Sequence, residues 1–160
     1  MNEATRELVA LIRVHRQRLE AVRGSIESAL EDEIARLGKT PVSALIIAGL
    51  LENYYTGLET IFLRISQHFE NRLDPARWHN DLLQKMTLEI EDVRVAAVSE
   101  AAFSPLFELL KFRHFKRYYF ELEYDWDRLD FLVAKLRQVH PLVMQDLERF
   151  VRFTGAVDRR

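Results

Sequence analysis

The run Thr40-Pro-Val-Ser-Ala-Leu-Ile-Ile-Ala-Gly-Leu-Leu51 is the longest stretch of this chain without a charged residue. A threonine followed by a proline is typical of a helix start, because threonine caps the free N–H groups and proline fits the first helical position. Apolar residues then occupy nearly every position, and beyond Leu51 they recur at spacings of three and four. The pattern predicts one long, central and largely buried helix from Pro41 to about Phe69.

Similar patterns predict helices on both sides of this run. Apolar residues recur every three or four positions before it, and Gly38 follows the last of them as a C-terminal cap. Asp74-Pro75 and Ser104-Pro105 repeat the polar residue–proline start signal. Pro141 is expected to kink or split the last helix. The predicted helices run from Glu3 to Leu37, from Pro41 to about Phe69, from Asp74-Pro75 through Met86, from Ser104-Pro105 to about Phe120, and from Asp125 or Asp127 to Gly155. The segment from Thr87 to Glu100 is either a loop or a short helical piece.

Composition supports an all-α protein. The chain has 160 residues, of which 48% are apolar, and only five are glycine and four proline. A chain of this length normally forms one domain, and few turn-forming residues argue against a β fold. We therefore expect a single all-α domain over residues 1–160, folded as an antiparallel bundle of about five helices.

Several classes of site are disfavoured. Cysteine is absent, and no two of the five histidines are spaced to bind one metal ion from one helix face, so we expect no metal site. No glycine-rich phosphate loop occurs, and we expect no cofactor. The net charge of −2 makes no chain-wide case for nucleic acid. The uncharged run is too short to cross a membrane. We expect a cytoplasmic protein without membrane contact.

The unusual stretch is Lys111-Phe-Arg-His-Phe-Lys-Arg-Tyr-Tyr-Phe120, in which basic and aromatic residues alternate. Cationic side chains neutralise phosphates, and aromatic rings stack on unpaired bases, so the stretch is a candidate RNA site. A histidine titrates near neutral pH and can exchange a proton with an RNA 2′-hydroxyl. The alternative is a purely structural helix whose aromatic rings pack in the core while the basic side chains extend to solvent.

These residues resemble the HEPN superfamily, in particular the HepT-like toxins of HEPN–MNT toxin–antitoxin pairs. The family motif is an arginine, a polar residue, three further residues, a histidine, one residue and a tyrosine. Arg113 and His114 match its first two positions. The segments Leu50–Glu59, Trp78–Leu83 and Tyr124–Leu129 also resemble family segments, and the resemblance covers most of Ala44 to Phe150.

The motif departs from the family at two positions. Tyr118 stands where the family has its histidine, and Phe120 stands where it has its tyrosine. A tyrosine has a pKa near 10 and is a poor base at neutral pH. The resemblance therefore implies catalytic candidates Arg113, His114 and Tyr118. The nucleic-acid-binding candidates are Lys111, Lys116, Arg117 and Tyr119.

The resemblance also implies partners. Active family members are metal-independent ribonucleases that work as homodimers on RNA, and their antitoxin is an MNT-type nucleotidyltransferase that attaches AMP to the motif tyrosine. Phe120 has no hydroxyl, so Tyr118 or Tyr119 would be the displaced acceptor. Three hypotheses follow: an endoribonuclease, a catalytically inactive module that binds RNA, a nucleotide or the MNT-type partner, and a helical adaptor without a nucleic-acid role.

Overall fold

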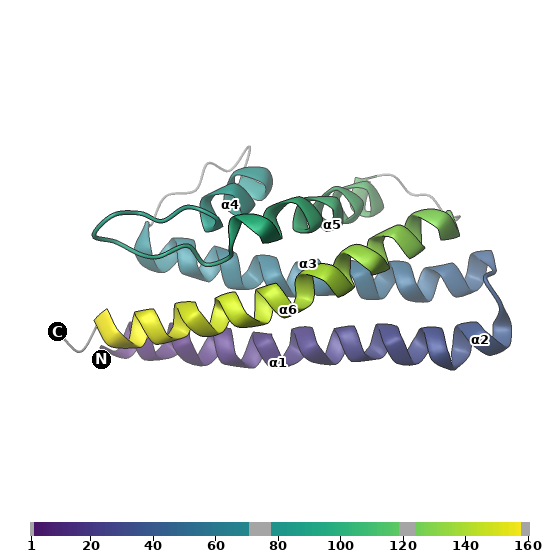
Figure 1. The fold of residues 1–160 in the computed structure, drawn as a ribbon, viewed down its shortest axis with the longest axis horizontal. Helices are drawn as coiled ribbons and strands as arrows, with labels where there is room; N and C mark the ends of the chain where they lie inside the picture. The colour runs from purple at the N-terminus through teal and green to yellow at the C-terminus, as the bar shows by residue number, and fades with distance from the viewer. Residues whose placement is uncertain (1, 71–77, 119–123, 158–160) are drawn as a thin grey trace.

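Four long helices form an antiparallel bundle (Figure 1). The structure is a computed structural model that describes residues 2–70, 78–118 and 124–157, with the backbone alone for residues 78–80 and 118. It contains six helices within these ranges and confirms the predicted all-α bundle. Their bounds are α1 (Glu3–Glu31), α2 (Glu33–Leu37), α3 (Pro41–Phe69), α4 (Trp78–Met86), α5 (Glu100–Tyr118) and α6 (Trp126–Val157).

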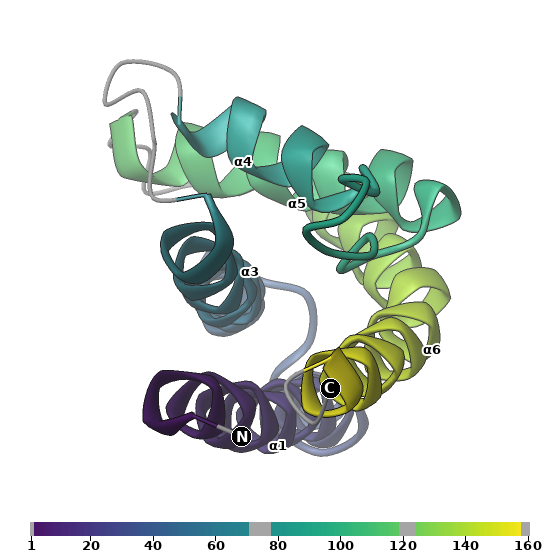
Figure 2. The same cartoon turned by 90° about the vertical axis from the view of Figure 1, so that its left-hand side faces the viewer.

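Viewed from its end, the bundle is a ring in which α1, α3, α5 and α6 follow one another, with α4 against α3 and α5 (Figure 2). Each long helix packs antiparallel to its two neighbours in the ring (Figure 1). The apolar core lies inside this ring. The part of the chain that the structure describes has no helix long and apolar enough to cross a membrane.

The helix α3 is the central one, as predicted, because it contacts every other described helix. Thr40 caps it: its hydroxyl accepts from the backbone N–H of Ser43 at 3.1 Å, and the Ser43 hydroxyl accepts from the Thr40 N–H at 2.8 Å. Its second half is buried, with Tyr54 and Phe62 fully enclosed. Its first two turns are less buried than the apolar run predicts, since Val42 is 73% exposed.

The first predicted helix is interrupted once, at Asp32, which separates α1 from α2. Asp32 lies between Glu31 and Glu33, and three acidic residues in a row are unfavourable at the negative end of a helix dipole. Gly38 ends α2 with φ of +78°, as expected for a capping glycine.

Three predicted boundaries differ in the structure. The helix α5 begins at Glu100 and not at Ser104-Pro105, so Pro105 lies in its second turn. A tertiary contact explains this, because the carboxylate of Asp146 on α6 accepts the backbone N–H of Ser99 at 2.7 Å and fixes the chain before α5. The helix α6 continues through Pro141 without a split and passes Gly155 to end at Val157. The Asp74-Pro75 start signal lies outside the described residues.

The segment between α4 and α5 is a loop fixed by one buried arginine. Arg94 is fully buried, and its guanidinium donates to Glu70 at 2.8 and 2.5 Å and to the backbone carbonyls of Leu88 and Lys85. Of the two alternatives for Thr87 to Glu100, the loop is therefore the observed one up to Ser99.

Candidate functional site

The predicted site lies on the last two turns of α5, where they pack against α3. Glu52, Thr56 and Glu59 are separated by four and three residues, so all three lie on one face of α3. Arg113 and Lys116, three residues apart on α5, reach this face. The two helices thus meet through paired polar side chains, at a place where the sequence left open either a basic RNA-binding face or a purely structural helix.

Arg113 is held inside this contact. Its Nε donates to Oγ1 of Thr56 at 2.9 Å, and one terminal nitrogen lies 3.2 Å from Oε1 of Glu59. The side chains of Arg113 and Glu59 are only 8% and 7% exposed. A buried guanidinium needs such partners, because an unpaired charge in the interior is costly. These contacts aim Arg113 at α3 and away from solvent.

The phenol of Tyr55 lies in the same buried environment. Burial raises its pKa above the usual value, the negative charge of Glu59 raises it further, and the positive charge of Arg113 opposes this. Tyr55 therefore stays protonated at neutral pH and supplies no base to the site.

Lys116 also points toward α3. Its Nζ lies 2.6 Å from Oε2 of Glu52, with both side chains about three quarters buried. Its positive charge is therefore largely compensated within the protein. An RNA phosphate would have to compete with Glu52 for this ammonium group.

The remaining basic candidates lie on the outer side of α5. Lys111, His114 and Arg117 are exposed. Lys111 contacts Oε1 of Glu108 at 2.9 Å and lies over the ring of Phe107. A hydrogen bond from Lys111 holds the pKa of Glu108 below its usual value; burial opposes this, and a hydrogen bond from Arg128 adds a smaller lowering. The acidic partner of Lys111 is therefore ionised at neutral pH.

A cavity of about 520 Å³ opens next to this face, between α5 and the start of α6. Its lining combines basic and aromatic side chains. The rings of Phe112 and Tyr124 meet edge to face, with their centroids 5.9 Å apart. Arg128 shares Glu108 with Lys111, at 3.2 Å. The lining residues are Lys111, Phe112, Phe115, Tyr124, Asp125, Arg128 and Leu129.

The structure divides the predicted set. It places Lys111, His114 and Arg117 on the outside of α5 and turns Arg113 and Lys116 inward. The backbone of Tyr118 ends α5, while its side chain, Tyr119 and Phe120 lie outside the described residues. Among the residues that are described, no group of three histidine or carboxylate side chains is placed to hold a metal ion.

Sequence reasoning missed the partners of the motif. Glu52, Thr56 and Glu59 were not candidates, although Leu50–Glu59 was one of the segments that carried the family resemblance. Tyr124 and Arg128 were also missed, although both lie in the resembling segment Tyr124–Leu129. The useful signal was that two resembling segments outside the motif, one far before it and one just after it in the sequence, contained polar residues at helical spacing.

Comparison with known proteins supports one family. The model of the HepT-like protein family matches residues 46–154, which covers α4 and α5 and nearly all of α3 and α6. No curated protein and no solved structure shows significant similarity to the chain. The family match spans more than half of the chain and includes the helices that build the site. This chain therefore belongs to the HepT-like proteins of the HEPN superfamily.

Proposed function

We propose that this HepT-like protein binds RNA at the C-terminal end of α5 without cutting it by the family's mechanism. The position of Arg113 carries the proposal. Its guanidinium is engaged by Thr56 and Glu59 in the interior, so it is not presented to a phosphate from solvent. The motif histidine, which would move the proton, is replaced by Tyr118.

The outer face of α5 supports RNA binding. Arg117 supplies an exposed positive charge, Lys111 supplies a second one that it shares with Glu108, and the neighbouring cavity offers the rings of Phe115 and Tyr124. Single-stranded RNA is commonly bound by such a combination, in which cations follow the phosphates and aromatic rings stack on bases. We propose that an unpaired base enters the cavity while its phosphates lie along Lys111 and Arg117.

An endoribonuclease is the second candidate. It is favoured by the exposure of His114 next to the exposed Arg117, because an accessible imidazole can transfer a proton and a guanidinium can stabilise phosphate charge. In this version Arg117 would replace Arg113 as the phosphate ligand, and Tyr118 would assist.

We further propose that the protein works as a homodimer. Leu45 lies two helical turns before Glu52 and therefore on the same face of α3, about 10 Å along the helix. This apolar start of α3 is exposed at Val42, Leu45 and Ile46. A second copy packed there would cover apolar surface and bring a second basic face close to the first.

The family also motivates an MNT-type nucleotidyltransferase as a partner. Its expected effect is transfer of AMP to Tyr118 or Tyr119, since Phe120 lacks a hydroxyl. Intact-mass measurement after incubation with such an enzyme and ATP tests this. A mass increase of one AMP that is lost only in the Tyr118→Phe/Tyr119→Phe double variant supports the proposal, and an unmodified chain contradicts it.

One experiment separates binding from cleavage. The protein is incubated with a fluorescent single-stranded RNA in EDTA, binding is followed by anisotropy, and the RNA is then run on a denaturing gel. We expect binding that is weakened in Lys111→Ala/Arg117→Ala, with intact RNA throughout. The matched control is Arg18→Ala/Arg64→Ala, which removes two exposed arginines from other faces. Cleavage that disappears in His114→Ala supports the second candidate, and RNA that is neither bound nor cut contradicts both.

A further inference from the structure

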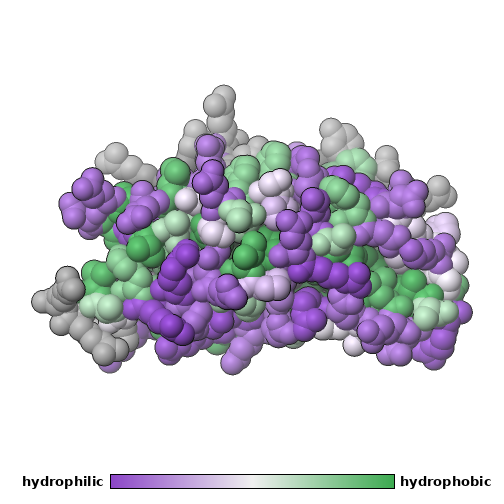
Figure 3. All heavy atoms as spheres, in the orientation of Figure 1, coloured by the Kyte–Doolittle hydropathy of each residue, from purple (hydrophilic) through white to green (hydrophobic). Residues whose placement is uncertain are grey.

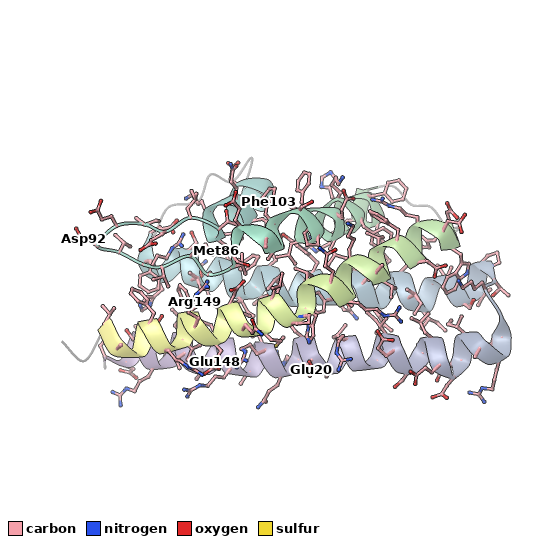
Figure 4. The ribbon with its side chains drawn as sticks, in the orientation of Figure 1. Glu20, Met86, Asp92, Phe103, Glu148 and Arg149 are labelled. Atoms are coloured by element: carbon pink, nitrogen blue, oxygen red, sulfur yellow. The ribbon has the colours of Figure 1, made fainter. Side chains whose placement is uncertain are left out.

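A second surface, between α1 and α6, has a different chemistry from the α5 site. Two adjoining hollows of about 410 Å³ each lie along this seam and share Glu148 and Arg152. Figure 4 places Glu148 and Arg149 on α6 where it passes over α1. Figure 3, in the same orientation, shows hydrophilic side chains gathered over this region, with apolar ones between them. We call the two hollows together the α1–α6 groove.

The groove is strongly positive. Of the residues that the structure describes, four arginines and one glutamate line it, and their charges sum to +3 on a chain whose overall charge is −2. The arginines form two walls: Arg13 and Arg16 come from α1, and Arg149 and Arg152 come from α6. Within each pair the spacing is three residues, so both members of a pair lie on one face of their helix.

The arginines differ in how they are held. Arg16 is fixed, with one terminal nitrogen 2.6 Å from Glu148 and the other donating to the carbonyl of Met144 at 3.0 Å. Arg149 contacts Asp146 at 3.2 Å, which partly offsets its charge, and also donates to the carbonyl of Ala96. Arg152 is 78% exposed and reaches Glu148 only at 3.4 Å. Arg13 on the other wall is also exposed, so each wall carries an accessible charge.

The floor of the groove is apolar. Met144 lies in one hollow, and Val9 and Val151, which are 5% and 3% exposed, lie in the other. Among the described residues, no aromatic side chain lines either hollow, in contrast to the cavity beside α5. Single-stranded nucleic acids are commonly bound by aromatic rings that stack on their bases, and they gain little from an aliphatic floor. A ligand that matches both features has an apolar stripe with carboxylates on each side.

We propose that the α1–α6 groove binds an acidic amphipathic helix of a partner protein. Such a helix would lie along the seam, place its apolar stripe over Met144 and the small exposed surface of Val9 and Val151, and direct carboxylates to the arginines of the two walls. Helix binding in an apolar groove between two helices is an established mode of recognition. Charges of opposite sign at the rim accelerate association and select against basic partners. The proposal does not depend on RNA binding at α5.

The probe is a labelled helical peptide of about 18 residues, long enough to form a helix on binding. Leucines at spacings of three and four form its apolar stripe, and glutamates flank the stripe on both sides. Its matched control carries glutamine at every glutamate position. Binding of each peptide to the full chain is measured by fluorescence anisotropy. We expect saturable binding of the glutamate peptide and at least tenfold weaker binding of the glutamine peptide, a difference of about 1.4 kcal/mol.

Variants locate the binding surface. Arg13→Glu and Arg152→Glu are each expected to weaken the glutamate peptide about tenfold or more, because they place like charges opposite each other. The matched controls are Arg18→Glu on α1 and Lys135→Glu on α6, which make the same charge change outside the groove. Glu148→Gln is expected to tighten binding, since it removes the carboxylate from the groove. Circular dichroism verifies that each variant keeps its helical content.

Three results overturn the proposal. The first is a glutamate peptide that does not bind up to millimolar protein. The second is equal weakening by all four arginine and lysine variants, which would indicate attraction by net charge alone. The third is an oligouridine whose binding is lost in Arg13→Glu and Arg152→Glu while peptide binding is not, which would make the groove a nucleic-acid surface.

Discussion

Arg113 on α5 and Glu59 on α3 form an ion pair in which both side chains are more than nine-tenths buried. Thr56 completes the arrangement by accepting a hydrogen bond from Nε of the same guanidinium. Arg113 is the residue that matches the first position of the family motif, yet in this chain it connects two helices of the bundle. Its removal is therefore expected to lower the stability of the fold more than the affinity for RNA.

The first prediction concerns the stability contribution of this pair. Arg113→Ala removes the guanidinium that pairs with the buried Glu59 carboxylate, and breaking a buried ion pair in this way costs about 3–5 kcal/mol. Urea unfolding followed by circular dichroism measures the free energy of unfolding. Arg117→Ala is the control, because Arg117 is exposed and its loss is expected to change that free energy by less than about 0.5 kcal/mol. Equal effects of the two variants would refute the buried role of Arg113.

We also expect the fold to tolerate the replacement of Arg113 and Glu59 together. Arg113→Met/Glu59→Leu removes both charges together and fills the space with apolar side chains. Buried ion pairs are often replaced in this way without loss of stability, because neither charge has to be desolvated. The double variant is expected to unfold at a higher urea concentration than Arg113→Ala alone. A double variant that is less stable than Arg113→Ala would contradict this prediction.

Another prediction concerns the buried contact of Tyr54. The hydroxyl of Tyr54 lies 2.8 Å from Nδ1 of His140, and Nε2 of the same ring lies 2.5 Å from Glu20. Tyr54→Phe leaves Nδ1 buried without this hydrogen bond, which costs about 1–3 kcal/mol. Thermal and urea unfolding measure the loss. Tyr124→Phe, at a half-buried position, is the control and is expected to change stability little.

Acid is expected to weaken the contact between α1 and α6. Two hydrogen bonds of 2.7 Å from Arg137 hold the pKa of Glu27 below its usual value, with burial acting in the opposite direction. A lowered pKa in the folded state adds stability above the unfolded value of about 4.3, and this stability is lost as the pH falls through the lowered value. Glu27→Gln should therefore show a smaller fall in unfolding free energy between about pH 5 and about pH 3 than the unmodified protein. An unchanged pH profile would contradict this assignment.

The cavity beside α5 supplies a prediction about RNA bases. Phe115→Ala removes a ring from the cavity lining, and loss of one base-stacking ring costs about 1–3 kcal/mol, or roughly fivefold or more in affinity. Anisotropy with single-stranded RNA measures this. Phe131→Ala removes an exposed ring on α6 outside the cavity and is expected to leave the affinity unchanged. If both variants bind RNA equally well, the cavity is not a base site.

The sequence predicted the bounds of the helices better than it predicted which of their residues are buried. The bounds of α3 follow from Thr40-Pro41 and from the apolar periodicity, because capping and amphipathicity are local properties. The start of α5 was predicted one turn too late, since the contact between Ser99 and Asp146 joins residues 47 positions apart. No local pattern reports such a contact.

The candidate site shows the same limit. The composition of Lys111 to Phe120 predicted a candidate site, and its described part lies on α5, but composition could not assign the cations there to the inner or the outer side of the helix. Arg113 and Arg117 are one turn apart and share a helix face, and the structure buries only Arg113. The difference arises from Thr56 and Glu59, which lie more than fifty residues away in the sequence.

The most direct test compares the RNA affinities of two variants that each remove one arginine of the motif region. Arg117→Ala removes the exposed cation, and Arg113→Met/Glu59→Leu removes the buried one together with its partner. Dissociation constants are measured by anisotropy with the same RNA at the same salt concentration, because phosphate binding depends on salt. We predict that Arg117→Ala weakens binding several-fold and that the double variant binds like the unmodified protein. A double variant that loses RNA binding while Arg117→Ala retains it would contradict the assignment of RNA binding to the outer face of α5.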